Sequence, residues 1–598
     1  MSIFSYLTKK TLTKENIFKS QNIPILLTGL FFILIIYLAF KNSVIVISDS
    51  FGFIGRAENL SFNNSSSWVD PFYPFGYPFL LKFFFKLTGD YLVAAKIISV
   101  FAGLFCLIYV YKIADLLYQH TVAIFSLIFL GLNPVFLKYA SIDGTDMIAV
   151  AFMLAFIYYL LYQKEKESFK HLIIAGVCLG LGYLIRYTSL ILLPCGILWL
   201  ITVSGSAMEK KNKIVIFIIS FLLIAGPQLI LSKILHNDYF WNLQYMNVWF
   251  GIYGNKNFGL AWSKAGEYHS LSEVFFINPS LFINNMFTNI KEALKLRLVN
   301  VPFYYTYSFL LGVVGIFLDK KAREKGALLL VCFIAYVIAI SMAFIGERLL
   351  LFLVPIEAIV SVYGFIFLLS NDWSFFKKYY NTIIITCLSI IAFSYIFRDT
   401  IGSIKNPYSD LQNGVIVVSN KLHQNGMKNS SEVLEFSYDF YDVDSPRKDR
   451  FNIPWHANPS FPPYQSMDDI KMRMAKAKER FLVYTKDSQW GIPGLLTFWD
   501  TKILPKEFSV LYDQDGVTVL QLNEIYLNTF NIATPEDFKK FVSTNPLPMI
   551  NETSYQDPAN KDYFFNLFQE NGNWTGQEWH RDNVLPLWKK YKEEHKLL

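Results

Sequence analysis

Long apolar runs separated by short polar connections fill the first 400 residues of the chain. Each run is close to the ~20 residues that a helix needs to cross a hydrocarbon core of about 30 Å. Because the backbone must satisfy its own hydrogen bonds in lipid, such runs form helices. The pattern therefore predicts a polytopic all-α membrane domain of about eleven spans. We place these spans at 23–40, 91–111, 121–138, 146–162, 172–185, 188–203, 214–231, 302–318, 327–345, 349–369 and 381–397.

The pattern changes near residue 400, where a polar helical stretch (410–424) and a charged one (467–479) alternate with short strand patterns. Two of the strand patterns flank Asp513–Gly516, a favourable hairpin turn. We expect a small soluble α/β domain over 401–598, after a membrane domain at 21–400 and an N-terminal segment at 1–20. The strand patterns lie at 432–437, 480–485, 507–512 and 516–521.

Composition agrees with a membrane protein. Of the 598 residues, 53% are hydrophobic and only 17% are charged, whereas soluble domains carry about a quarter charged residues. The net charge of +7 does not indicate a nucleic-acid partner, because the basic residues cluster in short connections between apolar runs. The five cysteines all lie inside apolar runs, which argues against a disulfide framework or a thiolate metal site.

The basic residues assign a side to each connection. The N-terminal segment and alternate connections carry 17 Lys and Arg residues, whereas the opposite short connections carry two, Arg186 and Arg348. Cytoplasmic loops are enriched in Lys and Arg, so the N-terminus is predicted to be cytoplasmic. Two long loops (41–90 and 232–301) and everything after about residue 398 are then on the outer side.

Charged residues gather at the outer ends of the predicted spans. Such groups are costly at the lipid edge unless they are paired or used. One interpretation is that each one lies in headgroup water and caps a helix, but six at the same depth favour a functional cluster. The six are Asp49, Asp143, Asp146, Arg186, Glu347 and Arg348.

Several motifs occur in a characteristic order. An amphipathic stretch (48–60) contains Asp49, and a turn rich in proline and aromatic residues (68–78) precedes the second span. Asn133-Pro134 follows near the end of the third span, and Asp146 opens the fourth. A glycine-rich span ends at Arg186, and Arg348 precedes a span that contains Leu and Pro. Over residues 20–400 this order resembles the GT-C superfamily of membrane glycosyltransferases, in particular the protein O-mannosyltransferases and lipid A aminoarabinose transferases.

The resemblance implies a sugar donor linked through phosphate to a polyprenyl lipid, and a glycan, lipid or protein acceptor. It implies that Asp49 is the catalytic base of an inverting transfer and that Arg186 and Arg348 bind the donor phosphate. Many relatives have two adjacent acidic residues where this chain has Asp49 between two serines. The other implied substrate-binding residues are Asp143 and Asp146 (or helix caps), Lys96 (or a lysine that extends to the headgroups), Tyr77 and Glu347.

Other interpretations remain at this stage. A polytopic transporter or lipid flippase is the main alternative, and Glu357, placed mid-span, is its best support. For Glu357 itself we expect a buried partner such as a tyrosine rather than a catalytic role. A non-catalytic membrane scaffold is the third. His236 and His269 lack ligand spacing, so no metal ligand is assigned, and a divalent-metal requirement is left open. We expect a bacterial inner-membrane protein.

Overall fold

The computed structural model groups the chain into two compact units. The first comprises residues 1–244 and 278–408, and the second comprises residues 245–277 and 409–598. The structure describes residues 22–41, 44–45, 49–63, 65–70, 72–166, 168–203, 205–253, 268–299, 303–370, 409–435, 440–445, 447–448, 451, 470–471, 474–475, 478–485, 506–514 and 516–527.

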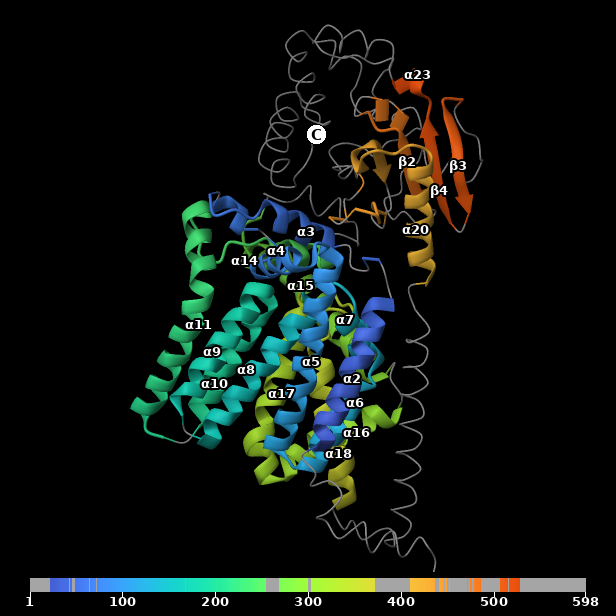
Figure 1. Cartoon of the computed structure of the whole chain (residues 1–598). Coiled ribbons are helices and arrows are strands. Elements are labelled where there is room, and N and C mark those ends of the chain that lie inside the picture. The colour runs from blue at the N-terminus through green and yellow to red at the C-terminus, as the bar shows by residue number, and fades with distance from the viewer. Residues whose placement is uncertain are drawn as a thin grey trace, which may run out of the picture. The chain divides into compact units, whose positions relative to one another are not determined.

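The described part of the first unit is almost entirely helical (Figure 1). Its longer helices are α2 (Asn22–Lys41), α5 (Tyr91–Leu117), α6 (His120–Gly131), α7 (Pro134–Ser141), α8 (Asp146–Lys166), α9 (Phe169–Ile185), α10 (Leu192–Thr202), α11 (Ala207–His236), α15 (Pro279–Leu294), α16 (Phe303–Leu318), α17 (Lys320–Ser341) and α18 (Leu353–Ser370). They overlap the predicted spans, except that α15 lies in the predicted outer loop 232–301. The predicted span at 381–397 lies outside the described residues.

Five of the described helices are long and apolar enough to cross a membrane, namely α2, α5, α8, α11 and α17. The pair α6 and α7 makes a sixth if it is one broken span. The sequence suggested an unbroken span here, but the structure bends by 64° between the two helices. Asn133 caps α7 by accepting a hydrogen bond from the Phe136 N–H (3.1 Å). Pro134 at the first helical position cannot continue α6.

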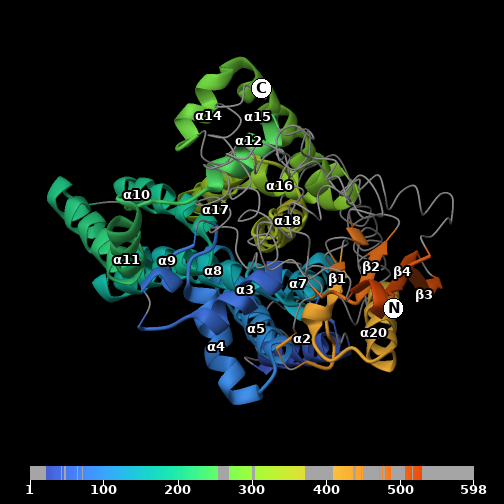
Figure 2. The same cartoon turned by 90° about the horizontal axis from the view of Figure 1, so that it is seen from above.

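Close helix packing builds the bundle. Viewed from above, α9 lies between α8 and α11, with which it makes extensive contacts (Figure 2). Helices α16 and α18 also pack closely, and here a glycine is required: a Cβ on Gly364 would collide with the backbone at Ser308 and Gly312. Small residues permit this approach, which is a common basis of helix association in membranes.

Short helices cover one end of the bundle, where the two outer-loop motifs lie (Figure 1). Helix α3 (Asp49–Asn59) follows α2, and a short 3₁₀ turn, η1 (Ser65–Trp68), leads towards α4 (Gly76–Thr88). A Cβ on Gly76 would collide with the carbonyl of Leu184, so glycine lets the start of α4 approach the end of α9. Another 3₁₀ turn, η2 (Tyr187–Ile191), and a five-residue π-helix, η3 (Lys295–Val299), precede α10 and α16.

The second unit contains a four-stranded mixed sheet in the order β1-β2-β4-β3. Strand β1 pairs with β2 in parallel, whereas the β2–β4 and β4–β3 pairs are antiparallel. The strands are β1 (Val433–Glu435), β2 (Phe481–Thr485), β3 (Phe508–Gln514) and β4 (Val517–Leu522), and the helices are α12 (Gln244–Tyr253), α14 (Leu271–Ile277), α20 (Ser409–Gln424), the 3₁₀ turn η4 (Ser430–Glu432) and α23 (Glu524–Leu527).

This sheet confirms the small α/β element predicted after the membrane domain. All four strand predictions lie within a few residues of the observed bounds, and Gly516 adopts the left-handed conformation (φ 77°) in the predicted hairpin turn. Buried residues such as Leu434, Leu482 and Leu520 form its core. The predicted helix at 467–479 and the tail beyond residue 527 lie largely outside the described residues. Whether the domain begins at residue 401 stays a prediction.

Candidate functional site

Four charged residues from four separate segments meet in the first unit. Asp49 is the first residue of α3 and Asp146 the first residue of α8, where a carboxylate is favoured by the helix dipole. Arg186 follows α9, and Arg348 lies in the turn before α18. All four were candidates from the sequence.

Arg348 joins the two carboxylates. Its Nη2 atom lies 2.6 Å from Oδ2 of Asp49, and its Nε atom lies 2.8 Å from Oδ2 of Asp146. Asp146 also forms an ion pair with Arg186. The Asp146 side chain is only 3% exposed, whereas those of Arg348 and Asp49 are 25% and 31% exposed. The network therefore has a buried centre at Asp146 and a solvent-accessible edge at Asp49 and Arg348.

Electrostatics keep Asp49 ionised. Burial raises the pKa of Asp49. Arg348 lowers it through its charge and its hydrogen bond, and the Tyr73 hydroxyl and Arg186 lower it further, so that the lowering effects outweigh burial. The net result is a pKa below the usual range for aspartate. Burial and the nearby charge of Arg348 lower the pKa of Arg186. The two guanidinium groups therefore repel each other, and the binding of an additional anion between them is favoured.

Two neighbours of the network were not among the sequence candidates. The Tyr73 hydroxyl is near enough to Asp49 to help lower the pKa of that carboxyl, and Ser50 donates a hydrogen bond to Asp143, which is buried. Tyr73 belongs to the aromatic turn that the sequence analysis singled out. Its position three residues after Asp70, whose side chain favours a turn, was the available signal.

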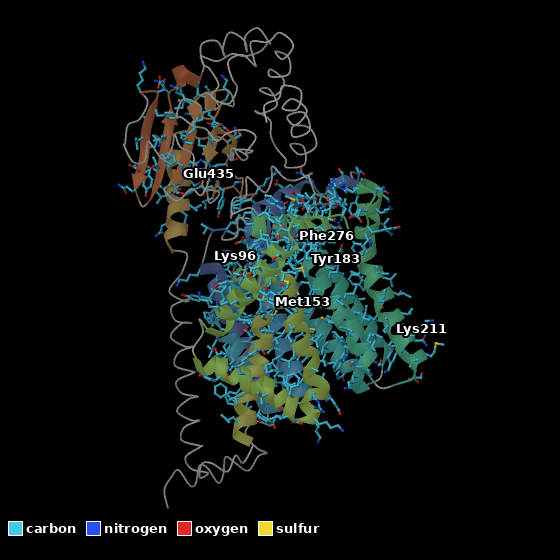
Figure 3. The ribbon with its side chains drawn as sticks, turned by 180° about the vertical axis from the view of Figure 1, so that it is seen from behind. Lys96, Met153, Tyr183, Lys211, Phe276 and Glu435 are labelled. Carbon is cyan, nitrogen blue, oxygen red and sulfur yellow. The ribbon has the colours of Figure 1, made fainter. Side chains whose placement is uncertain are left out.

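The remaining candidates lie nearby or are engaged otherwise. The Tyr77 hydroxyl accepts a hydrogen bond from the Gly144 N–H (3.2 Å), so Tyr77 holds the loop that carries Asp143. Glu347 forms an ion pair with Lys138 (2.8 Å). Lys96 is buried within α5 and does not extend to the surface. Figure 3 labels it in the upper half of the bundle.

Glu357 has a different partner from the one expected. The sequence suggested a tyrosine, but the Nε atom of Arg297 donates to both carboxylate oxygens of Glu357 (3.0 and 3.2 Å). Both side chains are buried, so the mid-span carboxylate forms a buried ion pair with Arg297. The strongest argument for a transporter is thereby weakened, because Glu357 is accounted for by a buried ion pair.

Basic connections gather at a different place in the bundle. Lys164 at the end of α8 donates to the carbonyl of Glu324 at the start of α17 (2.9 Å), and Lys325 donates to the carbonyl of Leu116 at the end of α5 (3.3 Å). Lys211 lies near the lower end of α11 in Figure 3. The connections assigned to one side of the membrane by charge thus contact one another in space.

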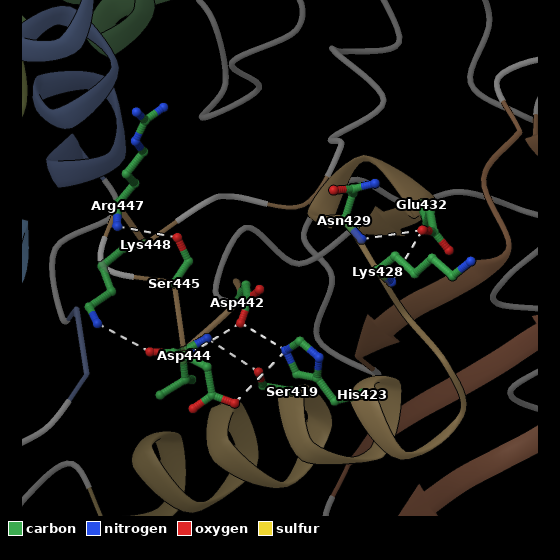
Figure 4. Close-up of polar contacts among 11 residues, drawn as sticks. Ser419, His423, Lys428, Asn429, Glu432, Asp442, Asp444, Ser445, Arg447 and Lys448 are labelled. Carbon is green, nitrogen blue, oxygen red and sulfur yellow. Dashed lines mark hydrogen bonds and ion pairs between the residues drawn. The ribbon is translucent and has the colours of Figure 1, made fainter.

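Among the described residues, one group of side chains in the second unit could hold a metal ion: His423 of α20 with Asp442 and Asp444 (Figure 4). The Nε2 atom of His423 lies 3.0 Å from Oδ1 of Asp442 and 3.9 Å from Oδ2 of Asp444. Elsewhere, the His236 ring stacks on Trp241 (centroids 3.4 Å apart). The backbone N–H of His269 donates a hydrogen bond to the Glu273 carboxylate (2.8 Å).

The fold and the site define a polytopic helical membrane protein that gathers two carboxylates and two guanidinium groups at the end of its bundle. Residues 73–231 match the family described as dolichyl-phosphate-mannose-protein mannosyltransferase. No match was found among curated proteins. The family match confirms the resemblance noted in the sequence, and the chain is a membrane glycosyltransferase. The transporter alternative is not favoured.

Two solved structures align with this chain. The oligosaccharyltransferase of Archaeoglobus fulgidus, in complex with Zn and sulfate, aligns with a TM-score of 0.50 and 12% identity, over 85% of this chain and 74% of that one. ArnT from Cupriavidus metallidurans, bound to undecaprenyl phosphate, aligns with a TM-score of 0.48 and 11% identity, over 83% of this chain and 97% of that one.

Proposed function

We propose that this protein transfers a sugar from a polyprenyl-phosphate-linked donor to an acceptor hydroxyl on the non-cytoplasmic face of the membrane, with inversion at the anomeric carbon. The observation that carries the proposal is the Arg348 bridge between Asp49 and Asp146. It puts a potential base and a phosphate-binding cation next to each other at the accessible edge of a buried network. The donor class is supported by the family match over residues 73–231.

Arg348 and Arg186 bind the donor phosphate in this proposal. A guanidinium group can bind phosphate oxygens through two hydrogen bonds at once. The buried Asp146 contacts both arginines and holds their side chains in place before the donor arrives. Lys96, Asp143, Tyr77 and Glu347 are proposed to contribute further contacts to the phosphate or the sugar.

Asp49 is the proposed base. As the acceptor oxygen bonds to the anomeric carbon, its proton passes to the Asp49 carboxylate and the bond from that carbon to the phosphate oxygen breaks. General base catalysis of this kind typically contributes 10²- to 10⁴-fold. The leaving polyprenyl phosphate gains a negative charge, which Arg348 and Arg186 stabilise strongly in a partly buried site.

The donor also adjusts the base. In the free protein Arg348 binds Asp49 and helps to keep its pKa low, which makes the carboxylate a weak base. A phosphate that takes hydrogen bonds from Arg348 withdraws that stabilisation from Asp49. The carboxylate then becomes more basic when the donor is bound, at the moment when the acceptor must be deprotonated.

The proposed topology has about eleven spans, of which the described residues supply ten apolar helical segments if the shorter and broken helices are included. Charge bias places the N-terminus in the cytoplasm and the C-terminal domain outside, and we propose a bacterial inner membrane. The C-terminal domain, proposed over 401–598, would recognise the acceptor or cover the outer face.

The test is sugar transfer by the purified full chain in detergent, using a panel of labelled polyprenyl-phosphate sugars. Asp49→Asn should abolish transfer while membrane insertion is unchanged. Asp115→Asn is the matched control, because Asp115 also has a basic partner, His120 (3.5 Å), and belongs to a helix end away from the network. Near-full turnover of Asp49→Asn would remove Asp49 from the role of base.

A further inference from the structure

Side chains from several segments hold the turn that contains Asp70, Phe72 and Tyr73. The Oδ1 atom of Asp70 accepts hydrogen bonds from the N–H groups of Phe72 and Tyr73, both at 2.8 Å. Such a turn lies outside helices and strands, so its remaining backbone groups need partners from elsewhere.

Three other segments supply those partners. Arg56 of α3 donates to the carbonyl of Tyr73 (2.7 Å), and Tyr187 of η2 donates to the carbonyl of Asp70 (3.1 Å). Gln244 donates to the carbonyl of Phe72 (2.7 Å). Arg56 additionally forms an ion pair with the Asp70 side chain (Nε to Oδ2, 3.4 Å). The backbone of the turn is therefore fixed from α3, η2 and Gln244 of the same unit.

The side chain of Tyr73 is fixed as well. Its ring packs edge-on against Phe53 of α3, with centroids 4.6 Å apart, which places it beside the helical turn that begins with Asp49. Arg56 and Phe53 lie on α3 together with Asp49. Helix α3 thus carries the proposed base Asp49, the Phe53 ring that packs against Tyr73, and Arg56, which binds the backbone of Tyr73.

We infer that Tyr73 is a positioning residue for Asp49 and that the Arg56–Asp70 ion pair sets the position of Tyr73. The inference rests on the proposed function, because it concerns how the proposed base is held. Arg348 lies 2.6 Å from the Asp49 carboxylate, and in this inference the Tyr73 hydroxyl, which helps to lower the pKa of Asp49, donates to the same carboxylate. When the donor phosphate draws Arg348 away, the Tyr73 hydroxyl still orients the carboxylate, so that a free lone pair faces the acceptor.

Tyr73→Phe removes one oxygen atom and leaves the ring in place. A hydrogen bond to a charged group is worth roughly 10- to 100-fold in an equilibrium or rate, so we expect kcat to fall by about 10-fold or more with the KM for the donor nearly unchanged. Arg56→Gln should lower kcat in the same way, and Arg56→Lys should restore part of it.

A pH profile separates positioning from general damage. The charged and titratable groups that face Asp49 are Arg348, Arg186 and Tyr73. Loss of the Tyr73 hydroxyl removes a donor that favours the ionised carboxylate, so the acid limb of kcat/KM should move to higher pH in Tyr73→Phe. A purely structural loss of folded protein lowers the whole profile without moving the limb.

Matched controls are Tyr111→Phe, which removes a hydroxyl bonded to His120 (3.0 Å), and Arg480→Gln, which breaks a half-buried pair with Glu432 (3.0 Å). If the unaltered protein transfers no sugar, the proposed function fails and the inference fails with it. If it transfers sugar while Tyr73→Phe matches Tyr111→Phe in both kcat and pH profile, only the inference is overturned. Should Arg56→Gln not fold, Tyr73→Phe still decides.

Discussion

Replacing Arg348 by lysine tests the site while keeping its charge. The guanidinium group uses two different nitrogen atoms for two different carboxylates, Nη2 for Asp49 (2.6 Å) and Nε for Asp146 (2.8 Å). A lysine ammonium is a single point on a flexible chain and cannot reproduce this planar fork. Arg348→Lys should therefore lose at least one charge-assisted hydrogen bond, worth about 1.5–3 kcal/mol.

That loss corresponds to a fall of roughly 10- to 100-fold in kcat/KM for the lipid donor. Kinetics with the donor varied at saturating acceptor, and then the reverse, would show whether the effect falls on donor use as expected. Arg480→Lys is the control, since Arg480 also binds two acceptors, Glu432 (3.0 Å) and the Gly426 carbonyl (2.9 Å). Donor kinetics in Arg348→Lys equal to those of the control would refute the phosphate-binding role.

Three further predictions address the bundle and the base. In thermal unfolding, Arg297→Met should lower the free energy of unfolding by about 3–5 kcal/mol, because it leaves the buried Glu357 carboxylate unpaired. Adding Glu357→Leu should restore most of the lost stability. Gly364→Ala should cost about 1–3 kcal/mol in the same assay, because its Cβ would displace the backbone at Ser308. The low pKa of Asp49 in the free protein should place the acid limb of kcat/KM below the ordinary aspartate value of about 3.9. The limb of kcat, which reports the donor complex, should lie at higher pH, and coincident limbs would show that the donor does not alter the base.

The sequence predicted those parts of the fold and site that depend on simple periodicity and sidedness. Helices α5, α8 and α17 and the strands of the small sheet could be found because their apolar patterns are long or regular. Asp49 and Arg348 could be expected near each other because both flank apolar runs on the same predicted side. Their meeting is a consequence of topology.

Other contacts depend on packing that no local pattern contains. Arg297 lies in a loop predicted to be on the outer side, so nothing in its neighbourhood indicated a place against Glu357 in the bundle. Tyr73 could not be distinguished from other interfacial aromatic residues, which are ordinary in membrane proteins, and Tyr77 was preferred instead. Both rings pack edge-on against Phe53 of α3. Their hydroxyls differ, since that of Tyr73 helps to lower the pKa of Asp49 whereas that of Tyr77 accepts a hydrogen bond from the Gly144 N–H.

The charges of the network explain why a base can be paired with an arginine and still act. Two carboxylates and two guanidinium groups balance one another in the free site. In the proposed transfer the donor phosphate goes from one negative charge to two, while Asp49, the proposed base, goes from one to none as it takes the acceptor's proton. Proton transfer therefore removes the remaining attraction between Asp49 and Arg348 as the leaving phosphate gains charge, and the total charge near the arginines stays constant. Because moving net charge in a low-dielectric site is expensive, this exchange lowers the barrier in a way that a base remote from the phosphate could not.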